Sequence, residues 1–268
     1  MSSMPGRPHT HGLFAGLRQA ARRLGAGLLL AVRVMACVNL GGGLAFAADA
    51  CPEPLASATR LALVTTPTMN AVSAEMDRFE RASPTAPWRR VGERWPVAVG
   101  LTGVGWGWSF AQYARGGEPL KREGDKRTPA GFFKLGRPFG FEPAALRNYL
   151  RLEKDQAFCV DDLRSPAYNT IVPRAAAGPG TSGETMWTVS LYRRGIVVDY
   201  PTNRAAAAGS CIFVHVWRSW ENGTVGCLAL AEPNVAELQA WASAAEVVLG
   251  VIPAGARARF AECLPMGL

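Results

Sequence analysis

The sequence predicts a single, mostly β domain of sandwich type, with one or two flanking helices, from about residue 58 to the end of the chain. About nine short apolar runs alternate with turns rich in Gly, Pro and Asn, which is the pattern of an all-β domain. Only two segments space their apolar residues as a helix does. The chain has no strand–helix–strand rhythm and no Gly-rich phosphate loop, which argues against a nucleotide-binding α/β fold.

The first 47 residues have the composition of a secretory leader. They carry five arginines and no acidic residue, and 34–46 is a short apolar core. Ala45-Phe46-Ala47 is a small-x-small cleavage signal, so we expect a mature domain of residues 48–268 in the periplasm or elsewhere in the cell envelope. The alternative is a lipoprotein signal that ends at Cys37. Neither apolar run reaches the ~20 residues that span a bilayer, so we expect no membrane span in the mature chain.

The net charge of +8 comes largely from this leader. Beyond residue 47 the chain holds 24 basic and 21 acidic residues. Such a small surplus, without a basic run interleaved with aromatic residues, predicts no nucleic-acid partner.

The first half of the domain is predicted to contain four strands and a helix. A strand over 60–65 precedes a helix over 69–81, and a hairpin over 88–99 then turns at Gly92-Glu93. The segment 100–108, rich in Gly and Trp, is expected to be a packed loop. Thr128-Pro129-Ala130-Gly131 is a turn that leads into a strand over 132–135.

The second half is predicted to be strands followed by a helix. Asp161 and Asp162 are expected to cap turns, because acid/base or cation-binding roles are less common for aspartates of this kind. The remaining predicted elements are, in order, strands over 186–191 and 195–200, a loop over 203–209, strands at 211–214 and 228–230, a helix over 235–249 with an apolar stripe of Leu238, Trp241, Ala245 and Val248, and a strand or coil over 252–260.

The stretch 209–230 carries the residues with the most chemical potential. One apolar run ends at His215, and after a polar loop the chain enters a second apolar run at Cys227. Two strands joined in this way bring an imidazole and a thiol within reach, which is how a thiol becomes a nucleophile. His215 is the only histidine outside the leader, which argues against a zinc site. A structural histidine beside a buried structural cysteine is the alternative interpretation.

This stretch resembles the active-site signature of the L,D-transpeptidase (YkuD-type) catalytic domain. In that family a histidine on one strand precedes a Ser/Thr-His-Gly-Cys motif, and here His215 and Thr224-Val225-Gly226-Cys227 match it. The segment 128–133 is similar to the family's Thr-Pro-x-Gly-x-Phe element. Val225 replaces the family's second histidine, and the spacing between His215 and Cys227 is several residues shorter than usual. Both departures point to a divergent branch.

The resemblance implies a YkuD-like β-sandwich and a peptidoglycan L,D-transpeptidase that joins stem peptides through a thioester, with 3→3 links, or 1→3 links in a divergent branch. It implies Cys227 as nucleophile, His215 as base and a backbone carbonyl of Val216 or Trp217 to orient that base. The amides of Gly226 or Val225, with that of Cys227, would form the oxyanion hole. The family is acylated by carbapenem-type inhibitors, and neither a cofactor nor a metal is implied.

Five further residues are candidates for binding the substrate. Arg218 could hold a carboxylate bidentately, and the alternative for it is a surface ion pair. The other four are Thr224, Trp217, Tyr200 and Tyr168.

Five cysteines follow the leader, an odd number that fits two disulfides and one free thiol in an oxidising compartment. If Cys227 is the nucleophile, it is the free one, and the other four allow three pairings. We favour Cys51–Cys263, which would tie the two ends together, with Cys159–Cys211. The alternative is that all five are reduced and buried.

Two other functions remain open at this point. An enzyme of the same fold that passes the acyl group to water would be an L,D-carboxypeptidase or hydrolase. A sandwich with an inert Cys227 would be a non-catalytic module that binds the cell wall.

Overall fold

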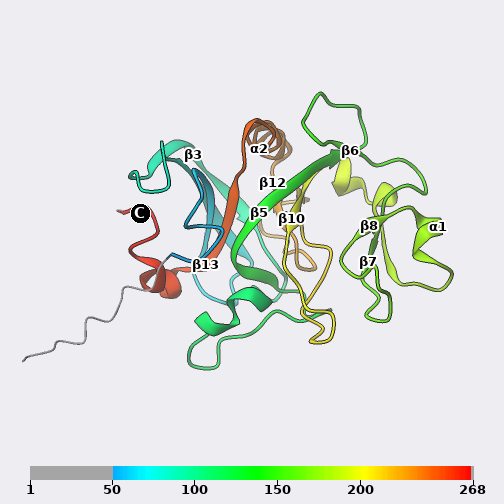
Figure 1. Ribbon diagram of the computed structural model, residues 1–268, viewed down its shortest axis with the longest axis horizontal. Coiled ribbons are helices and arrows are strands. Elements are labelled where there is room, and N and C mark those ends of the chain that lie inside the picture. The colour runs from blue at the N-terminus through cyan, green and yellow to red at the C-terminus, as the bar shows by residue number, and fades with distance from the viewer. Residues whose placement is uncertain (1–50, 267–268) are drawn as a thin grey trace, which may run out of the picture. The chain divides into compact units, whose positions relative to one another are not determined.

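The computed structural model describes residues 51–266 (Figure 1). These residues form one compact unit. The expected leader, its cleavage site and the alternative signal at Cys37 lie outside the described residues. Within 51–266, every helix falls short of the length and apolar character that a bilayer crossing needs.

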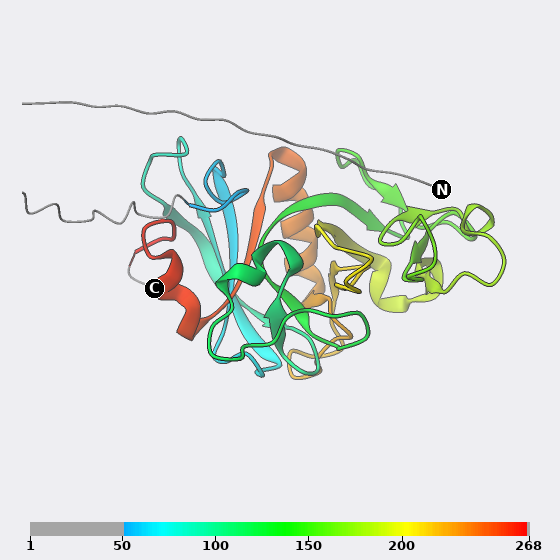
Figure 2. The ribbon, with the colours of Figure 1, turned by 60° about the horizontal axis from the view of Figure 1, so that its bottom comes forward.

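Eight strands close into a mixed β-barrel, in which β5 pairs with β13 on one side and with β10 on the other (Figures 1 and 2). The pairs β1–β13 and β11–β12 are parallel, and the other six pairs are antiparallel. Around the ring the strands are β10 (Arg194–Asp199), β11 (Phe213–Val216), β12 (Leu228–Leu230), β3 (Arg89–Ala98), β2 (Ser73–Glu80), β1 (Arg60–Thr66), β13 (Val248–Pro253) and β5 (Thr128–Gly140).

The prediction of a mostly β domain is confirmed, but the sheet is a closed barrel where the sequence predicted a sandwich. The strand β5 is 13 residues long, and β4 (Val104–Trp106) and β6 (Leu150–Arg151) also pair with it. Apolar periodicity identifies a strand but does not say which edge meets which. A closed ring and two packed sheets therefore give the same sequence pattern.

A second, three-stranded sheet lies at the end of the barrel where β5 and β6 end (Figure 1). It consists of β7 (Phe158–Val160) between β8 (Ile171–Val172) and β9 (Gly183–Thr185), with the one-turn helix α1 (Arg174–Ala177) beside it. The disulfide Cys159–Cys211 joins β7 to the segment that leads into β11. This small sheet is thereby fixed next to the strand that carries His215.

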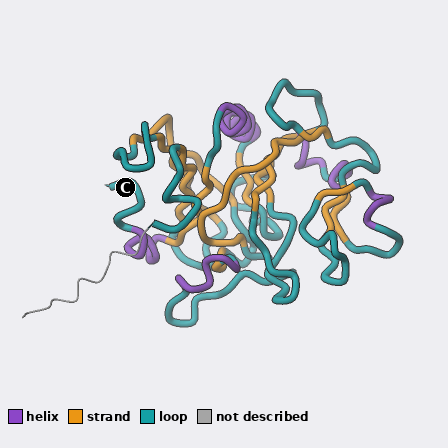
Figure 3. Tube along the Cα trace, viewed as in Figure 1, coloured by secondary structure: helices purple, strands orange, loops and turns teal. Residues whose placement is uncertain are grey.

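The helix α2 (Glu232–Ala244) packs on the outside of the barrel (Figures 1 and 3). Its Gln239 side chain is buried and donates hydrogen bonds of 2.8 Å to the carbonyl oxygens of Phe139 in β5 and Gly195 in β10. Leu238 of the predicted stripe is buried in the core. The helix ends five residues earlier than predicted, because Val248 begins β13 and pairs with β1. Four 3-10 segments complete the structure: Trp108–Tyr113, Met186–Thr188, Ser190–Arg193 and Ala254–Phe260.

The predicted helix over 69–81 is wrong, because most of this segment forms β2. The charged pair Asp77 and Arg78 looks like the polar face of a helix, yet both residues are buried in the barrel wall. Asp77 pairs with Arg90 and Arg94 of β3. Neutralisation by a neighbouring strand is a tertiary effect that helical spacing does not reveal.

The predicted hairpin over 88–99 is also wrong, since one continuous strand, β3, covers it. Gly92 has a φ of +67° and is a bulge within this strand. A side chain at Gly92 would collide with the guanidinium of Arg78. The predicted strand over 186–191 is replaced by two 3-10 turns, and the loop over 100–108 contains the short strand β4.

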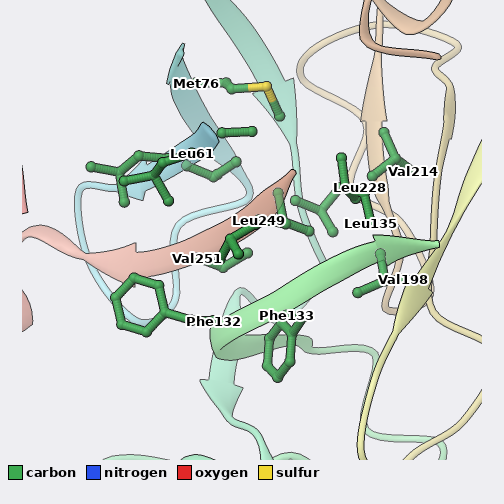
Figure 4. Close-up of a cluster of buried hydrophobic side chains, with 14 of the residues drawn as sticks. Leu61, Met76, Phe132, Phe133, Leu135, Val198, Val214, Leu228, Leu249 and Val251 are labelled. Atoms are coloured by element: carbon green, nitrogen blue, oxygen red, sulfur yellow. The ribbon is translucent and has the colours of Figure 1, made fainter. Parts of the chain in front are cut away.

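The first six residues of β5 are all buried, and Phe132 and Phe133 lie among the side chains of the core (Figure 4). The ring of Phe132 packs 5.1 Å from that of Phe260, and the next ring, Phe133, packs 5.4 Å from that of Tyr200. Figure 4 shows Leu249 of β13 beside these side chains. Each such side chain contributes about 1.5–3 kcal/mol when it is fully buried.

The favoured disulfide pairing is confirmed. Cys51 bonds Cys263 and Cys159 bonds Cys211, and Cys227 is the free cysteine of the described residues. The first bond joins two residues that are 212 positions apart, at the two ends of the barrel domain.

Replacing both Cys51 and Cys263 with serine should lower the free energy of unfolding by about 2–4 kcal/mol, because the bond restricts the unfolded chain. Urea unfolding of the purified protein measures this. The variant C227S breaks no disulfide and serves as the control. A double variant with the midpoint of wild type would show that this bond does not stabilise the domain.

Candidate functional site

His215 lies in β11, between β10 and β12. Its side chain is buried, and Nδ1 lies 2.9 Å from the carbonyl oxygen of Val216. A carbonyl oxygen only accepts, so Nδ1 carries the ring hydrogen and Nε2 is left as the basic nitrogen. Val216 is one of the two carbonyls that the sequence analysis expected to orient this ring.

Cys227 directly precedes β12, which pairs in parallel with β11. The register sets His215 opposite Ala229, two residues after Cys227. Residues two apart on a strand share a face, so Cys227 and His215 project to the same side of the sheet as diagonal neighbours. Tyr192 supports their proximity, because its ring packs 5.2 Å from that of His215 and it belongs to the same buried cluster as Cys227.

The thiol and the imidazole are both neutral in this arrangement. Burial, with a smaller effect from the Glu184 carboxylate, raises the pKa of Cys227 to about 12. Burial lowers the pKa of His215 to about 4 against the opposing effect of the Val216 hydrogen bond. The thiol donates to the carbonyl oxygen of Cys211, with an S···O distance of 3.6 Å, and the described residues show no direct hydrogen bond between Cys227 and His215.

Two threonine hydroxyls fix the backbone of Cys227. Thr224 Oγ1 and Thr128 Oγ1 donate to the carbonyl oxygen of Cys227 at 2.6 and 2.8 Å. Thr128 is the first residue of β5, so the Thr-Pro-Ala-Gly stretch touches the loop that carries the cysteine. These contacts hold the Cys227 backbone from two sides.

Gly226 and Val225, whose amides are expected to form the oxyanion hole, differ in their surroundings. The Gly226 amide donates to Thr224 Oγ1 at 3.1 Å, so an oxyanion would have to compete with that hydroxyl. Val225 is 72% exposed, which places its backbone at the surface beside the thiol.

A buried ammonium lies beside the Cys227 loop. Lys121 Nζ pairs with Asp125 at 2.5 Å and donates to the Arg122 carbonyl oxygen at 2.7 Å. If Gly226 carried a Cβ, that atom would lie 3.8 Å from Lys121 Nζ, and a Cβ at Gly209 would lie 3.3 Å from it. Both glycines have positive φ. The Lys121 charge lowers the pKa of Cys227, against the larger effect of burial.

The expected substrate-binding residues have different surroundings. Arg218 is exposed and has no ion pair among the described residues, and Trp217 beside it is half-buried. The hydroxyl of Tyr200 donates to the Ala208 carbonyl oxygen at 2.6 Å, and that of Tyr168 donates to Glu123 at 2.5 Å. These two tyrosines, like Thr224, use their hydroxyls to hold loops around the site.

Of the two aspartates that follow β7, Asp162 caps a turn as expected, whereas Asp161 is bound by Ser182, 21 residues away. Asp162 accepts from the Arg164 backbone amide at 2.9 Å and from the Arg164 guanidinium, and Asp161 accepts from Ser182 Oγ at 2.5 Å. Within the described residues no group of three or more His, Cys, Asp or Glu side chains is close enough to hold a metal ion.

Sequence reasoning missed two residues of this site, Tyr192 and Glu184. Tyr192 stands in the predicted turn of a hairpin, and Glu184 in a Gly-rich segment without a recognisable motif. Their hydroxyl and carboxylate lie 2.7 Å apart. The contact joins β9 to a 3-10 turn, so no local spacing signals it.

Comparisons with known proteins leave the family of this chain open. No family model matches it, and no curated protein matches it. Among solved structures, the helical cell shape determining protein Pgp2 from Campylobacter jejuni aligns with 18% identity and a TM-score of 0.37, over 72% of this chain and 47% of that one. A point mutant of Pgp2 aligns with 17% identity and a TM-score of 0.36, over 73% and 48%. The chain thus spans about half the length of these structures.

The reaction of Cys227 with iodoacetamide should accelerate about tenfold per pH unit between pH 6 and 9, without a plateau, because only the thiolate reacts. A thiol pKa of about 12 and an imidazole pKa of about 4 both lie outside this range. Intact-protein mass over time measures the rate, since the other cysteines of the described residues are in disulfides. A rate independent of pH from 5 to 9 would reveal a preformed thiolate–imidazolium pair instead.

Proposed function

We propose that this protein is a cysteine acyltransferase of the cell wall, a peptidoglycan L,D-transpeptidase of a divergent branch. The observation that carries the proposal is the geometry of Cys227 and His215. The free thiol and the only imidazole of the domain project from the same face of two adjacent parallel strands, with the imidazole oriented by the Val216 carbonyl. A nucleophile, a base and a group that orients the base are the parts that acyl transfer through a thioester requires.

The first half of the reaction forms the acyl-enzyme. Nε2 of His215 takes the proton of the Cys227 thiol as Sγ attacks the carbonyl carbon of a substrate amide. Because thiol and imidazole are neutral at rest, proton transfer accompanies the attack. The tetrahedral intermediate collapses, the C–N bond breaks, and the amine leaves with the proton from His215. The product is a thioester on Sγ.

The second half returns the enzyme. An amine of a second stem peptide attacks the thioester, gives its proton to His215, and forms the new amide as the C–S bond breaks. The thiolate regains its proton from His215. If water replaces the amine, the same steps give a carboxypeptidase. The resemblance to the L,D-transpeptidase domain supports a stem peptide as donor, and the exposed, unpaired Arg218 supports recognition of a substrate carboxylate.

A non-catalytic wall-binding module is the second candidate, and one observation favours it. The thiol of Cys227 is buried and its pKa is raised to about 12, as expected of an inert structural cysteine. An active thiol and an inert one differ in whether an acylating substrate analogue adds to Cys227.

Incubation with a carbapenem should add a single mass to the purified protein, and the adduct should be absent in C227A, because Cys227 is the free thiol within residues 51–266. H215Q should slow the acylation at least a hundredfold, since general base catalysis typically contributes 10²–10⁴-fold. The exposed K154A variant is the control and should match wild type. Failure of the folded wild-type protein to form an adduct would favour the wall-binding module.

Disaccharide-tetrapeptides as the only substrate should yield cross-linked dimers and free D-Ala, which mass spectrometry of the products distinguishes. Dimers establish the transpeptidase. Release of D-Ala without dimers would identify the carboxypeptidase, and an unchanged substrate would count against both.

A further inference from the structure

Tyr192 contacts both of the side chains that the proposed mechanism uses. Its ring is 3% exposed and meets the rings of His215 and Phe213 edge-on, with centroids 5.2 and 5.5 Å away. Its hydroxyl donates to Glu184 Oε2 at 2.7 Å, and Tyr192 packs in the same buried cluster as Cys227, where it lowers the pKa of the thiol. One phenol therefore joins the imidazole, the thiol and a carboxylate.

The phenol has a single hydrogen to donate and two acceptors within reach. While the thiol is neutral, the carboxylate of Glu184 is the stronger acceptor, because hydrogen bonds to a charged group are about twice as strong. The thiol hydrogen meanwhile points to the Cys211 carbonyl oxygen. Once Sγ has lost its proton, it is a second anion in the same buried cluster and competes for the phenol hydrogen.

The charges around the thiol act in opposite directions. After burial, the Glu184 carboxylate is the next cause that raises the pKa of Cys227, while the Tyr192 hydrogen bond and the Lys121 ammonium lower it. Glu184 is half-buried on β9, and burial raises its own pKa, with Asp161 adding to the effect and the Tyr192 hydrogen bond opposing it. His215, on β11, is the remaining titratable group and is neutral.

We propose that Tyr192 is a catalytic residue whose hydroxyl turns from Glu184 to the Cys227 sulfur as the thiol is deprotonated, and that Glu184 is a positioning residue that holds the phenol and restrains the resting thiol. The thiol proton goes to Nε2 of His215, and the phenol hydrogen stays on Tyr192 and changes only its acceptor. This inference rests on the proposed function, because it takes Cys227 as the reacting thiol.

The variants Y192F and E184Q should change the ionisation of Cys227 in opposite directions. Y192F removes a hydrogen bond to the thiolate, so the curve of alkylation rate against pH should move to higher pH, with a loss on the order of tenfold at pH 8. E184Q removes a negative charge, so the same curve should move to lower pH with a gain of similar size. Iodoacetamide alkylation, followed by intact mass, measures both.

Two matched variants serve as controls. Y149F removes a hydroxyl that donates to the Glu142 carbonyl oxygen at 2.6 Å, and E246Q removes a carboxylate that pairs with Lys134. Neither should move the curve. An unchanged curve for Y192F, or a shift to higher pH for E184Q, would overturn the proposal and leave these residues a packing role. If Y192F fails to fold, the direction of the E184Q shift decides.

Turnover measurements distinguish a failure of this proposal from a failure of the proposed function. With a peptide substrate, Y192F should lower kcat about tenfold and leave KM within about twofold, because the hydroxyl acts on the thiolate and not on the bound substrate. Alkylation needs no peptide, so a protein without acyltransfer activity still tests the role of Tyr192. Normal acyltransfer with an unmoved alkylation curve would reject the role of Tyr192 alone.

Discussion

The closure of the barrel by β5 is the constraint on which the site depends. This strand pairs with β13 through residues 131–134 and with β10 through residues 134–140. Because β10 pairs next with β11, closure fixes the strand that carries His215. The first residue of β5, Thr128, donates to the carbonyl of Cys227, so the same strand also holds the proposed nucleophile. If β5 did not close the barrel, both His215 and Cys227 would lose their positions.

Burial decides the charge state of the site. It lowers the pKa of His215 to about 4 and raises that of Cys227 to about 12. His215 therefore resists gaining a proton, and Cys227 resists losing one. Each pKa unit corresponds to about 1.4 kcal/mol, and proton transfer before the substrate arrives is therefore unfavourable. The cost of desolvating two charges exceeds their attraction. A neutral, buried thiol resists oxidation, and in the proposed mechanism it reacts only when a bound carbonyl accepts the developing charge.

The disulfide Cys159–Cys211 connects this chemistry to the small sheet. Cys159 and Glu184 are paired residues of β7 and β9, so the bond that holds β7 near β11 also brings Glu184 to the site. Cys211 has a φ of +54°, and Asn169 Oδ1 accepts from its amide at 2.9 Å. Its carbonyl receives the thiol hydrogen of Cys227. One covalent bond thus sets the position of a carboxylate and of the acceptor for the resting thiol.

The sequence by itself determined the features that depend only on short segments of the chain or on the number of residues of one type. Local apolar runs located β1, β10, β11 and β12, and the odd number of cysteines, with the motif, indicated Cys227 as the free thiol and left three possible pairings of the other four. The spacing of His215 and Cys227 marked the site because both lie on one short supersecondary unit. Only the tertiary structure decided the barrel, the strand identity of β2, the end of α2 and the contacts of Tyr192 and Glu184. Each of these depends on partners far along the chain: β3 neutralises Asp77, β1 draws Val248 into the sheet, and a disulfide brings β9 to the thiol. Such pairings are set by packing over the whole domain, so a single sequence shows the groups but not which of them meet.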